Sequence, residues 1–216
     1  MTFWKQVWPE ISNQSLQDLE IKSTRIEISR GSHLYEAGQN PEGIFAIETG
    51  LIGLTAICAN GNEVLLRLFG PNQYFGHRSI MAEEPYHATA TAMEICKVRK
   101  LRKDHLFTLM QNDFALCRSV LKTLARELKH QEDRLCTLAE KPVASRIAEG
   151  LIYLTSIVED HKFTRMQIAE YCGTTEPTVI RTLARFEKES LISQIGRKIK
   201  IIDRETLLKV ALSERD

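Results

Sequence analysis

Hydrophobic positions recur with two different spacings along this chain, and the spacing changes near residue 104. Between Ile21 and Lys100 the apolar residues come in short runs, several of them alternating with polar residues as in half-buried strands. The runs are separated by turn residues such as Gly50 and by the Asn60-Gly61 pair, which is a strong hairpin signal. The predicted strands cover residues 26–28, 44–48, 51–57, 64–69 and 88–93. Several short strands at regular spacing predict an antiparallel barrel or jelly roll.

Helical spacing predominates on both sides of this strand-rich region. Trp4, Val7, Trp8 and Ile11 predict a short helix within residues 1–20, and a second piece of helix is expected to begin at Ser15. After the strands, Asp104 is expected to cap a short helix that ends near Met110. The further predicted helices cover residues 112–139, 143–157 and 205–212, with a break at Pro142.

The longest predicted helix carries a narrow seam whose positions follow one another at steps of three and four residues. The seam consists of Phe114, Cys117, Leu121, Leu124, Leu128, Gln131, Leu135 and Leu138. A heptad pattern over more than three repeats predicts a parallel contact between two copies of the chain, in which Gln131 lowers stability but sets the register. The alternative is one helix that packs on its own barrel.

Residues 164–201 form the pattern on which the functional prediction rests. Thr164 and Gln167 fit a capping box at the start of a helix, and Gly173 supplies a tight turn after it. Thr174 or Thr175 can cap a second helix, with Pro177 in its first turn. An extended segment beginning at Leu191, a Gly196-Arg197 turn and an alternating Lys198–Ile201 strand follow. The segment is predicted to be a helix-turn-helix followed by a β wing.

The second helix of such a pair fits the major groove of B-DNA. Arg181 lies about one turn into it, where a guanidinium can pair with guanine, while Arg185, Lys188, Arg197, Lys198 and Lys200 suit phosphates. Between Arg181 and Lys200 there are six basic residues and two acidic ones. The alternative is an ordinary helical hairpin with a solvated basic face. The predicted DNA contacts are Thr164, Arg165, Thr175, Glu176, Pro177, Thr178, Arg181, Arg185, Lys188, Arg197 and Lys198.

Composition narrows the class of protein without naming its function. The chain has 216 residues, 43% apolar and 26% charged, with a net charge of +1, so a DNA-binding function must rest on local charge. No apolar run approaches the ~20 residues that span a membrane, and the first ten residues lack the regions of a signal peptide. The five cysteines include no Cys-x-x-Cys pair, so we expect reduced thiols in a cytoplasmic protein.

Seven short motifs occur in the order barrel, long helix, hinge and winged helix-turn-helix. They are Leu34-Tyr35-x-x-Gly38, Ile47-x-x-Gly50, Asn60-Gly61-x-Glu63, Phe75-Gly76, Arg146-Ile147-Ala148, the run from Gly173 to Arg181, and Leu191-Ile192. This ordered set resembles the bacterial cyclic-AMP-receptor/FNR (CRP/FNR) family of transcription regulators. The resemblance implies an α+β fold with a cyclic-nucleotide-binding-type jelly roll, a dimerisation helix and a winged helix-turn-helix. The expected domains are residues 1–111, 112–140 and 141–216.

The resemblance also implies a homodimer that binds a pseudo-palindromic promoter site and recruits RNA polymerase. Any small-molecule effector is expected in the barrel, and a protein controlled only by its abundance is the alternative. The expected effector region comprises Phe75, Gly76, His77, Arg78, Ser79, Tyr86, His87, Ala88, Thr89, Gln131 and Glu132. In the recognition helix the family usually has glutamate where this chain has Pro177, so the preferred DNA sequence is expected to differ.

The effector region departs from the cyclic-nucleotide-binding pattern that the resemblance implies. His77 stands where those members have a ribose-binding glutamate, residues 83–89 contain no arginine to clamp a phosphate, and Gln131-Glu132 replace the Thr-Ser pair that reaches the adenine. An unpaired phosphate in a dry pocket is costly. We therefore expect no tight cyclic-AMP binding, although Arg78 is close enough to substitute.

Other sensors and other classes of function are expected to be absent. No cysteine precedes Cys58, which argues against the N-terminal iron–sulfur cluster of oxygen-sensing members. His77 or His87 could bind haem, or with Glu83 and Glu84 a metal in a cupin-like enzyme, but a lone histidine is more often structural. The chain has no Gly-rich phosphate loop, Gly-x-Ser-x-Gly or His-Glu-x-x-His motif. A module that binds a protein partner instead of DNA is the last alternative, and the basic wing argues against it.

Overall fold

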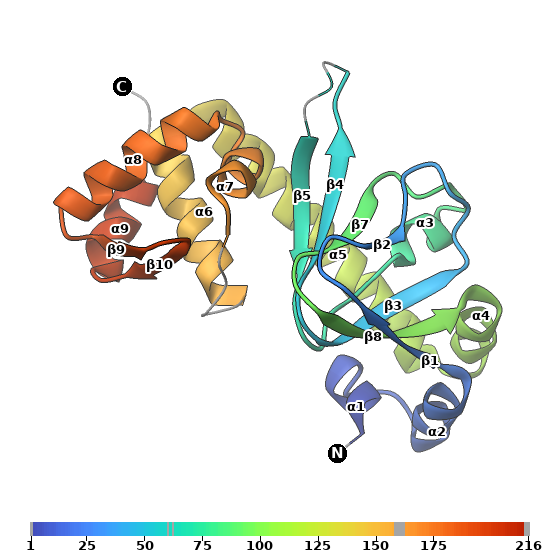
Figure 1. Cartoon of the computed structure of the whole chain (residues 1–216). Helices are drawn as coiled ribbons and strands as arrows, with labels where there is room; N and C mark the ends of the chain where they lie inside the picture. The colour runs from blue at the N-terminus through green and yellow to red at the C-terminus, as the bar shows by residue number, and fades with distance from the viewer. Residues whose placement is uncertain (1, 60, 62, 158–162, 214–216) are drawn as a thin grey trace. The chain divides into compact units, whose positions relative to one another are not determined.

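The computed structural model describes residues 2–59, 61, 63–157 and 163–213 (Figure 1). The chain forms two compact units, Met1–Ile57 with Leu66–Lys129, and Cys58–Leu65 with His130–Asp216. The predicted turn residue Asn60 and the polar loop at 159–162 lie outside the described residues. None of the helices in the described ranges is both long and apolar enough to cross a membrane.

The first unit is built mainly from short strands, with helices before and after them. The strands are β1 (Thr24–Ile28), β2 (His33–Tyr35), β3 (Gly43–Thr49), β4 (Ile52–Ile57), β5 (Glu63–Phe69), β6 (Tyr74–Phe75), β7 (Thr89–Ala92) and β8 (Cys96–Arg102). The helices are α1 (Phe3–Val7), α2 (Asn13–Lys22), α3 (His77–Met81) and α4 (Lys103–Asn112), and the long helix α5 (Phe114–Glu140) begins in this unit.

The strands form two open four-stranded sheets. Of the two predicted arrangements, a barrel or a jelly roll, the structure therefore has the jelly-roll-like one. The strand orders are β1-β8-β3-β6 and β2-β7-β4-β5. One apolar core lies between the sheets and takes residues from both, for example Ile47 and Val98 from one and Leu54 and Ala90 from the other. This is a jelly-roll-like sandwich, and its central strand β8 pairs antiparallel with both β1 and β3.

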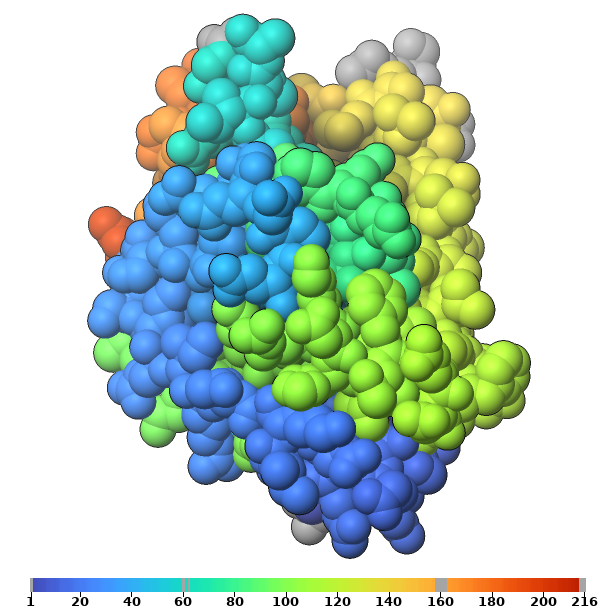
Figure 2. Space-filling model, turned by 90° about the vertical axis from the view of Figure 1, so that its right-hand side faces the viewer, coloured from blue at the N-terminus to red at the C-terminus, as the bar shows by residue number. Residues whose placement is uncertain are grey.

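A second core lies between the first sheet and the helices. Ile44, Ala46 and Leu101 project from the sheet into a cluster with Trp4, Trp8 and other residues of α1, α2, α4 and α5. Trp4 and Trp8 stack with their ring centroids 5.2 Å apart. In Figures 1 and 2 the dark blue N-terminal helices accordingly lie beside the green residues of β8 and α4.

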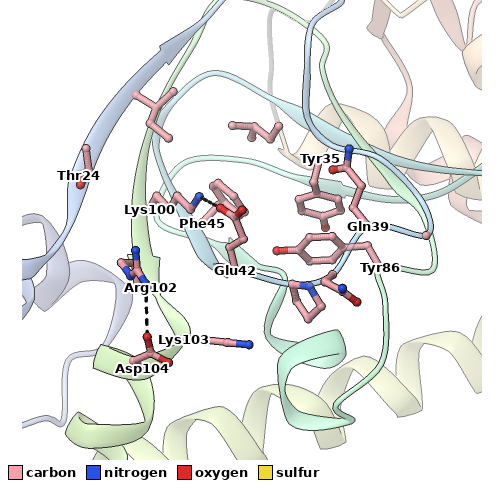
Figure 3. A pocket seen from close by; sticks show the side chains of 15 residues that line it. Thr24, Tyr35, Gln39, Glu42, Phe45, Tyr86, Lys100, Arg102, Lys103 and Asp104 are labelled. Atoms are coloured by element: carbon pink, nitrogen blue, oxygen red, sulfur yellow. Dashed lines mark hydrogen bonds and ion pairs between the residues drawn. The ribbon is translucent and has the colours of Figure 1, made fainter.

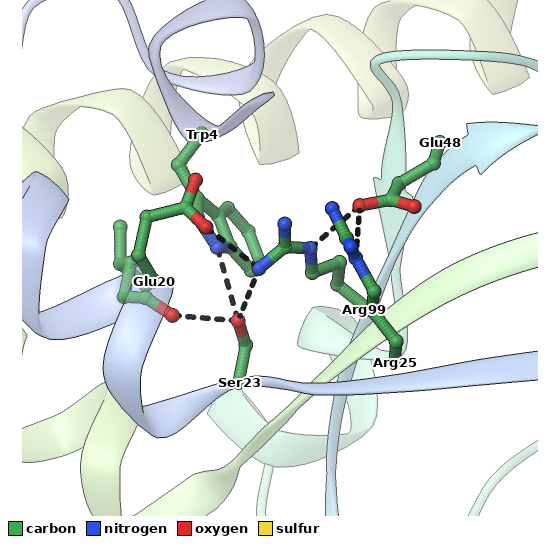
Figure 4. Close-up of polar contacts among 7 residues, drawn as sticks. Trp4, Glu20, Ser23, Arg25, Glu48 and Arg99 are labelled. Carbon is green, nitrogen blue, oxygen red and sulfur yellow. Dashed lines mark hydrogen bonds and ion pairs between the residues drawn. The ribbon is translucent and has the colours of Figure 1, made fainter. Parts of the chain in front are cut away.

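Strand β8 was not predicted because its sequence, Cys-Lys-Val-Arg-Lys-Leu-Arg, is too basic for a typical buried strand. The structure shows how the most buried of these charges, that of Arg99, is accommodated, although the residue is only 6% exposed. Its guanidinium donates to Glu48 (2.6 Å) and to Glu20 (2.7 Å) (Figure 4). It also lies over the ring of Phe3. A buried charge is tolerated when it is paired in this way. The network joins α2 and the N-terminal helix to the sheet.

Two of the predicted helix starts were wrong by one to three residues. The second N-terminal helix is capped by Ser12, whose hydroxyl accepts from the backbone N–H of Ser15, so Ser15 lies inside the helix. Helix α4 begins after Arg102, and Asp104 lies in its first turn without capping it. Asp104 still faces the positive end of the helix dipole, which explains why the sequence pattern suggested a start there.

Asp113 connects α2 to the start of α5. Its carboxylate accepts hydrogen bonds from Ser15 Oγ (2.7 Å) and from the backbone N–H groups of Ser12 (2.9 Å) and Ala115 (3.0 Å). Burial alone would raise the pKa of Asp113, but these hydrogen bonds lower it from 3.8 to about 2. The ionised carboxylate is therefore favoured in the folded state.

Because the folded pKa of Asp113 is lower than the unfolded one, its contribution to stability is complete above pH ~4 and is lost as the pH falls toward 2. Asp113→Asn is expected to lower the free energy of unfolding by about 2 kcal/mol at pH 7 and by much less near pH 2. Urea unfolding at both pH values measures the difference. The exposed Glu36→Gln is the control and should show neither effect, whereas a loss for Asp113→Asn that is independent of pH would contradict this assignment.

The second unit contains the remaining helices and a two-stranded sheet. Its elements after α5 are α6 (Val143–Ile157), α7 (Arg165–Cys172), α8 (Glu176–Lys188), β9 (Ile192–Ile195), β10 (Lys198–Ile201) and α9 (Arg204–Ala211). The apolar faces of α6, α7 and α8 are buried together with Leu191 and Leu207. The helices predicted at 143–157 and 205–212 are thus present, the latter one residue earlier than expected.

Candidate functional site

The first helix of the predicted DNA-binding pair is held at both ends by local contacts. Thr164 Oγ1 accepts from the N–H of Gln167 (3.1 Å), and Gln167 Oε1 accepts from the N–H of Thr164 (2.9 Å), so the predicted capping box is present at the start of α7. Gly173 ends the helix with φ +61°. A Cβ at this position would lie 2.8 Å from a methyl carbon of Leu138, so glycine satisfies both the turn and the packing.

Helix α8 presents two different faces. Val179, Leu183 and Phe186 are completely buried, which fixes the helix against the rest of the unit. Pro177 lies in the first turn as predicted, and Thr175 is the N-cap residue. The Thr175 hydroxyl does not cap the backbone, however, because it hydrogen-bonds the hydroxyl of Thr178 at 2.9 Å.

The outer face of α8 is exposed and basic. Arg181, Arg185 and Lys188 are all exposed, and Arg181 is steadied by a 3.2 Å hydrogen bond from its guanidinium to Thr178. Thr178 therefore connects the start of the helix to the arginine predicted to read a base. The exposed Pro177 and the half-buried Glu176 lie in the first turn, next to this face.

The wing is fastened to the helix pair by two side chains. Arg165 donates to Gln194 Oε1 (2.6 Å) and to the carbonyl of Gly196 (3.2 Å). Glu187 accepts from the backbone and the side-chain amide of the same Gln194 at 2.7 and 3.0 Å. In the structure the guanidinium of Arg165 is thus hydrogen-bonded to the wing, and its predicted contact with DNA stays a prediction. Arg197 at the tip of the wing is exposed, and Lys198 beside it is half-buried.

Within the first unit, most of the expected effector region is buried. Phe75, His77, Ser79, Tyr86 and Ala88 are each at most 5% exposed, whereas Arg78 and His87 face outward. Gly76 adopts φ +87° and begins α3, where a Cβ would lie 3.1 Å from the carbonyl oxygen of Gly43. Thr89 accepts from the N–H of Ala37 at 3.2 Å. Gln131 and Glu132 belong to the second unit.

His77 is bonded to helix α5 by a contact that the sequence did not predict. Its Nε2 lies 3.1 Å from a carboxylate oxygen of Glu127, and Arg67 pairs with the same oxygen at 2.7 Å. Burial alone would raise the pKa of Glu127, but the hydrogen bonds from His77 and Arg67 lower it. The position at which nucleotide-binding members have glutamate is here a histidine that is already paired.

The two histidines do not converge. His87 Nδ1 lies 3.3 Å from the guanidinium of Arg78, which also pairs with Glu84 at 3.3 Å. No group of three or more metal-ligating side chains occurs in the described ranges. Arg78, the arginine that could have substituted as a phosphate clamp, is therefore engaged at the surface.

Four residues of the predicted seam, which follow one another at intervals of seven residues along α5, are exposed. Phe114, Leu121, Leu128 and Leu135 are 78%, 64%, 61% and 68% exposed. The other four seam residues, Cys117, Leu124, Gln131 and Leu138, are half-buried. The face that packs on the core of the first unit uses Leu116 and Val120, which are outside the seam, together with the seam residue Leu124. The four exposed side chains thus lie on one stripe of α5 that the described residues leave open to solvent.

Comparison with known proteins shows which family combines these parts. The model of the cyclic nucleotide-binding domain matches residues 25–113, and that of the Crp-like helix-turn-helix domain matches residues 145–210. The chain belongs to the CRP/FNR family of transcription regulators. It is therefore a DNA-binding regulator of the CRP/FNR type and not an enzyme.

Several CRP/FNR relatives are similar over most of their length. The CRP-like cAMP-activated global transcriptional regulator of Mycobacterium tuberculosis is 25% identical over 195 residues, covering 86% of this chain and 87% of the relative. The transcriptional activator protein FnrA of Stutzerimonas stutzeri is 26% identical over 188 residues, covering 82% and 75%. FixK2 from Bradyrhizobium japonicum shares the fold, with a TM-score of 0.80 and 22% identity over 88% of this chain and 98% of that one.

The sequence did not predict contacts between side chains that lie far apart along the chain. Glu127 lies 50 residues from His77, and Gln194 lies 29 residues from Arg165. Neither is part of a local motif. Helical spacing offered a signal for Glu127, because this residue lies seven positions after Val120 on the buried face of α5, where a carboxylate requires a partner.

Proposed function

We propose that this chain forms a homodimer that binds a pseudo-palindromic promoter site, with one α8 helix in each half-site. The observation that carries the proposal is the exposed basic face of α8 beside the exposed wing residue Arg197. Two recognition helices related by a two-fold axis fit half-sites about 34 Å apart. RNA polymerase is the further partner that the family resemblance implies.

Dimerisation through α5 is supported by the stripe of Phe114, Leu121, Leu128 and Leu135. The seam of a two-stranded coiled coil has apolar side chains at two positions of each heptad, and these four residues occupy one of the two. Their exposure in one chain provides apolar surface that a second copy can cover.

The effector proposal follows from the charges around α3. His77 Nε2 is paired with the carboxylate of Glu127, and Arg78 pairs with Glu84 at the surface. A cyclic phosphate would have to compete with Glu127 for His77, and Arg78, the arginine that could clamp it, faces outward at the surface. We therefore propose that cyclic AMP is not a tight ligand, and that any effector acts by binding one arrangement of the dimer better than another.

Arg181→Ala tests the role of α8. Removing a guanidinium that pairs with guanine should cost about 1–3 kcal/mol on the specific site and little on random DNA. The specific site is first selected from a random duplex pool with the wild-type protein, and binding is then measured by fluorescence anisotropy.

Arg204→Ala is the matched control, because Arg204 is exposed on α9 and is not part of the predicted DNA contacts. It should leave both affinities close to those of the wild type. Equal losses on specific and random DNA for Arg181→Ala would make Arg181 a phosphate contact and refute its role in base recognition.

A further inference from the structure

The first unit contains a cavity of about 980 Å³ to which neither the DNA-binding surface nor the expected effector region assigns a role. It opens between the loop at 38–42, the strands β1 and β8, and the start of α4 (Figure 3). Of the described residues lining it, Tyr86 alone was predicted as an effector contact. Cavities of this size are typical of sites for metabolite-sized ligands.

Lys100 occupies a position of β8 whose neighbours face the core between the sheets. Its cross-strand partners are Thr24 on β1 and Phe45 on β3, and directly paired residues of an antiparallel sheet project to the same face. Phe45 belongs to the inter-sheet core, as does Val98 two positions before Lys100. Lys100 therefore places its ammonium group at the edge of the apolar core between the sheets. The alternation of side chains along a strand would place a hydrophobic side chain at this position.

The anion that now pairs with this ammonium group is weakly held. Lys100 donates to the carboxylate of Glu42, and the Lys100 side chain is 26% exposed while that of Glu42 is 76% exposed. The hydrogen bond from Lys100 lowers the pKa of Glu42, because it stabilises the charged form of the carboxylate. An ion pair with one such exposed partner contributes little net stability. A carboxylate brought by a ligand can therefore replace Glu42.

The rest of the rim favours anions as well. Arg102 and Lys103 line the cavity beside Lys100, and Asp104 pairs loosely with Arg102 at 3.5 Å, with both side chains mainly exposed. Lys103 forms no ion pair with another residue in the described ranges. The rim thus carries more positive than negative charge.

The inner wall is aromatic and held in place by hydrogen bonds. Tyr35 and Tyr86 stack with ring centroids 3.5 Å apart, and Tyr86 donates its hydroxyl to the carbonyl of Gly43 (3.0 Å). The loop is tied to Tyr86 by two backbone bonds, from the N–H of Gly38 to Tyr86 O (2.7 Å) and from the N–H of Tyr86 to Gln39 O (2.9 Å). A wall formed in advance reduces the ordering cost of binding.

We propose that this cavity binds a small organic anion in which a carboxylate is attached to an aromatic or similarly flat apolar body. The carboxylate pairs with Lys100 in place of Glu42, and the apolar body lies along Phe45 and the tyrosine pair. All of these residues belong to the first unit. Binding is therefore independent of dimerisation and of DNA recognition, and failure of one proposal does not decide the other.

Calorimetric titration of the full chain with 2-naphthoate tests the proposal. We expect saturable binding at one site per chain. 2-Naphthamide has the same body without the charge, and acetate has the charge without the body. Each should bind at least about tenfold more weakly, because the site requires both parts.

Lys100→Gln should weaken 2-naphthoate binding about tenfold and bring it to the level of the amide. Lys97→Gln is the matched control, because Lys97 is an exposed lysine on the opposite face of the same strand. The affinity of this variant for 2-naphthoate should equal that of the wild type. Glu42→Gln should tighten binding by up to about fivefold, since it removes the competing carboxylate. This variant keeps the proposal testable if Lys100→Gln does not fold, which circular dichroism would show.

Three outcomes would overturn the proposal. The first is the absence of saturable 2-naphthoate binding to the wild type, and the second is equal affinity for the amide. The third is an equal loss in the Lys97 and Lys100 variants, which would indicate a general charge effect in place of a site.

Discussion

Leu121→Asp combined with Leu128→Asp is expected to convert the protein into a monomer and to weaken its binding to inverted-repeat DNA at least about a hundredfold. The two leucines are more than 60% exposed in the single chain, and they recur at the same position of the heptad. Covering four leucines in a dimer contributes about 1.5–3 kcal/mol for each side chain. Four carboxylates in the same seam would have to be desolvated and would repel one another.

Analytical ultracentrifugation measures the first effect, and anisotropy on the selected site measures the second. The DNA effect is large because a dimer binds its second half-site intramolecularly, whereas monomers bind each half-site separately. Lys122→Asp with Arg126→Asp is the control, since both positions are exposed on α5 outside the seam. This control should remain dimeric, and a leucine variant that stays dimeric would disprove the seam.

Gly50→Ala is expected to lower the free energy of unfolding by about 3–5 kcal/mol, a loss large enough to unfold many domains. Gly50 joins β3 to β4 with φ +94°, a conformation that residues with a Cβ rarely adopt. An added Cβ would lie 2.5 Å from Cys96 Sγ and 2.8 Å from both Cys96 Cα and Ile95 O. Two of these are backbone atoms of the segment that leads into the central strand β8, so they cannot move without disturbing the sheet.

Gly31→Ala separates the two causes of this loss. Gly31 also has a positive φ, +83°, but a Cβ there meets nothing within 4 Å. Its cost should therefore be limited to the backbone conformation, about 1–2 kcal/mol. Chemical denaturation of both variants measures the difference, and equal losses would show that crowding at Gly50 is unimportant.

The recognition unit could be predicted well because its signals are local. A capping box spans four residues, a turn glycine acts on its own backbone, and a proline fits the first turn of whichever helix it begins. Thr164, Gly173 and Pro177 accordingly have the positions in the structure that the sequence indicated. The seam of α5 was predicted for a similar reason, since a seven-residue repeat is a property of one helix.

Strand β8 could not be predicted from the local sequence pattern. Its basic residues did not indicate a central strand, because the acids that pair with Arg99 lie 51 and 79 residues away. The hydrogen bond between Arg165 and Gln194 was not predicted either, because the two residues lie 29 positions apart in the chain. A charge pattern alone cannot distinguish a solvated arginine from one that holds two elements together.

The sequence by itself determined the order of a strand-rich region, a long helix and a helix-turn-helix, because these patterns depend on spacings of a few residues. The tertiary structure decided which charges are free to meet a ligand or DNA. It paired Arg99 with Glu20 and Glu48, hydrogen-bonded Arg165 to the wing, joined His77 to Glu127, and left Arg181 and Lys103 exposed. The physical reason is that partners distant in the chain meet only after folding, and desolvation then determines which of their charges must be paired.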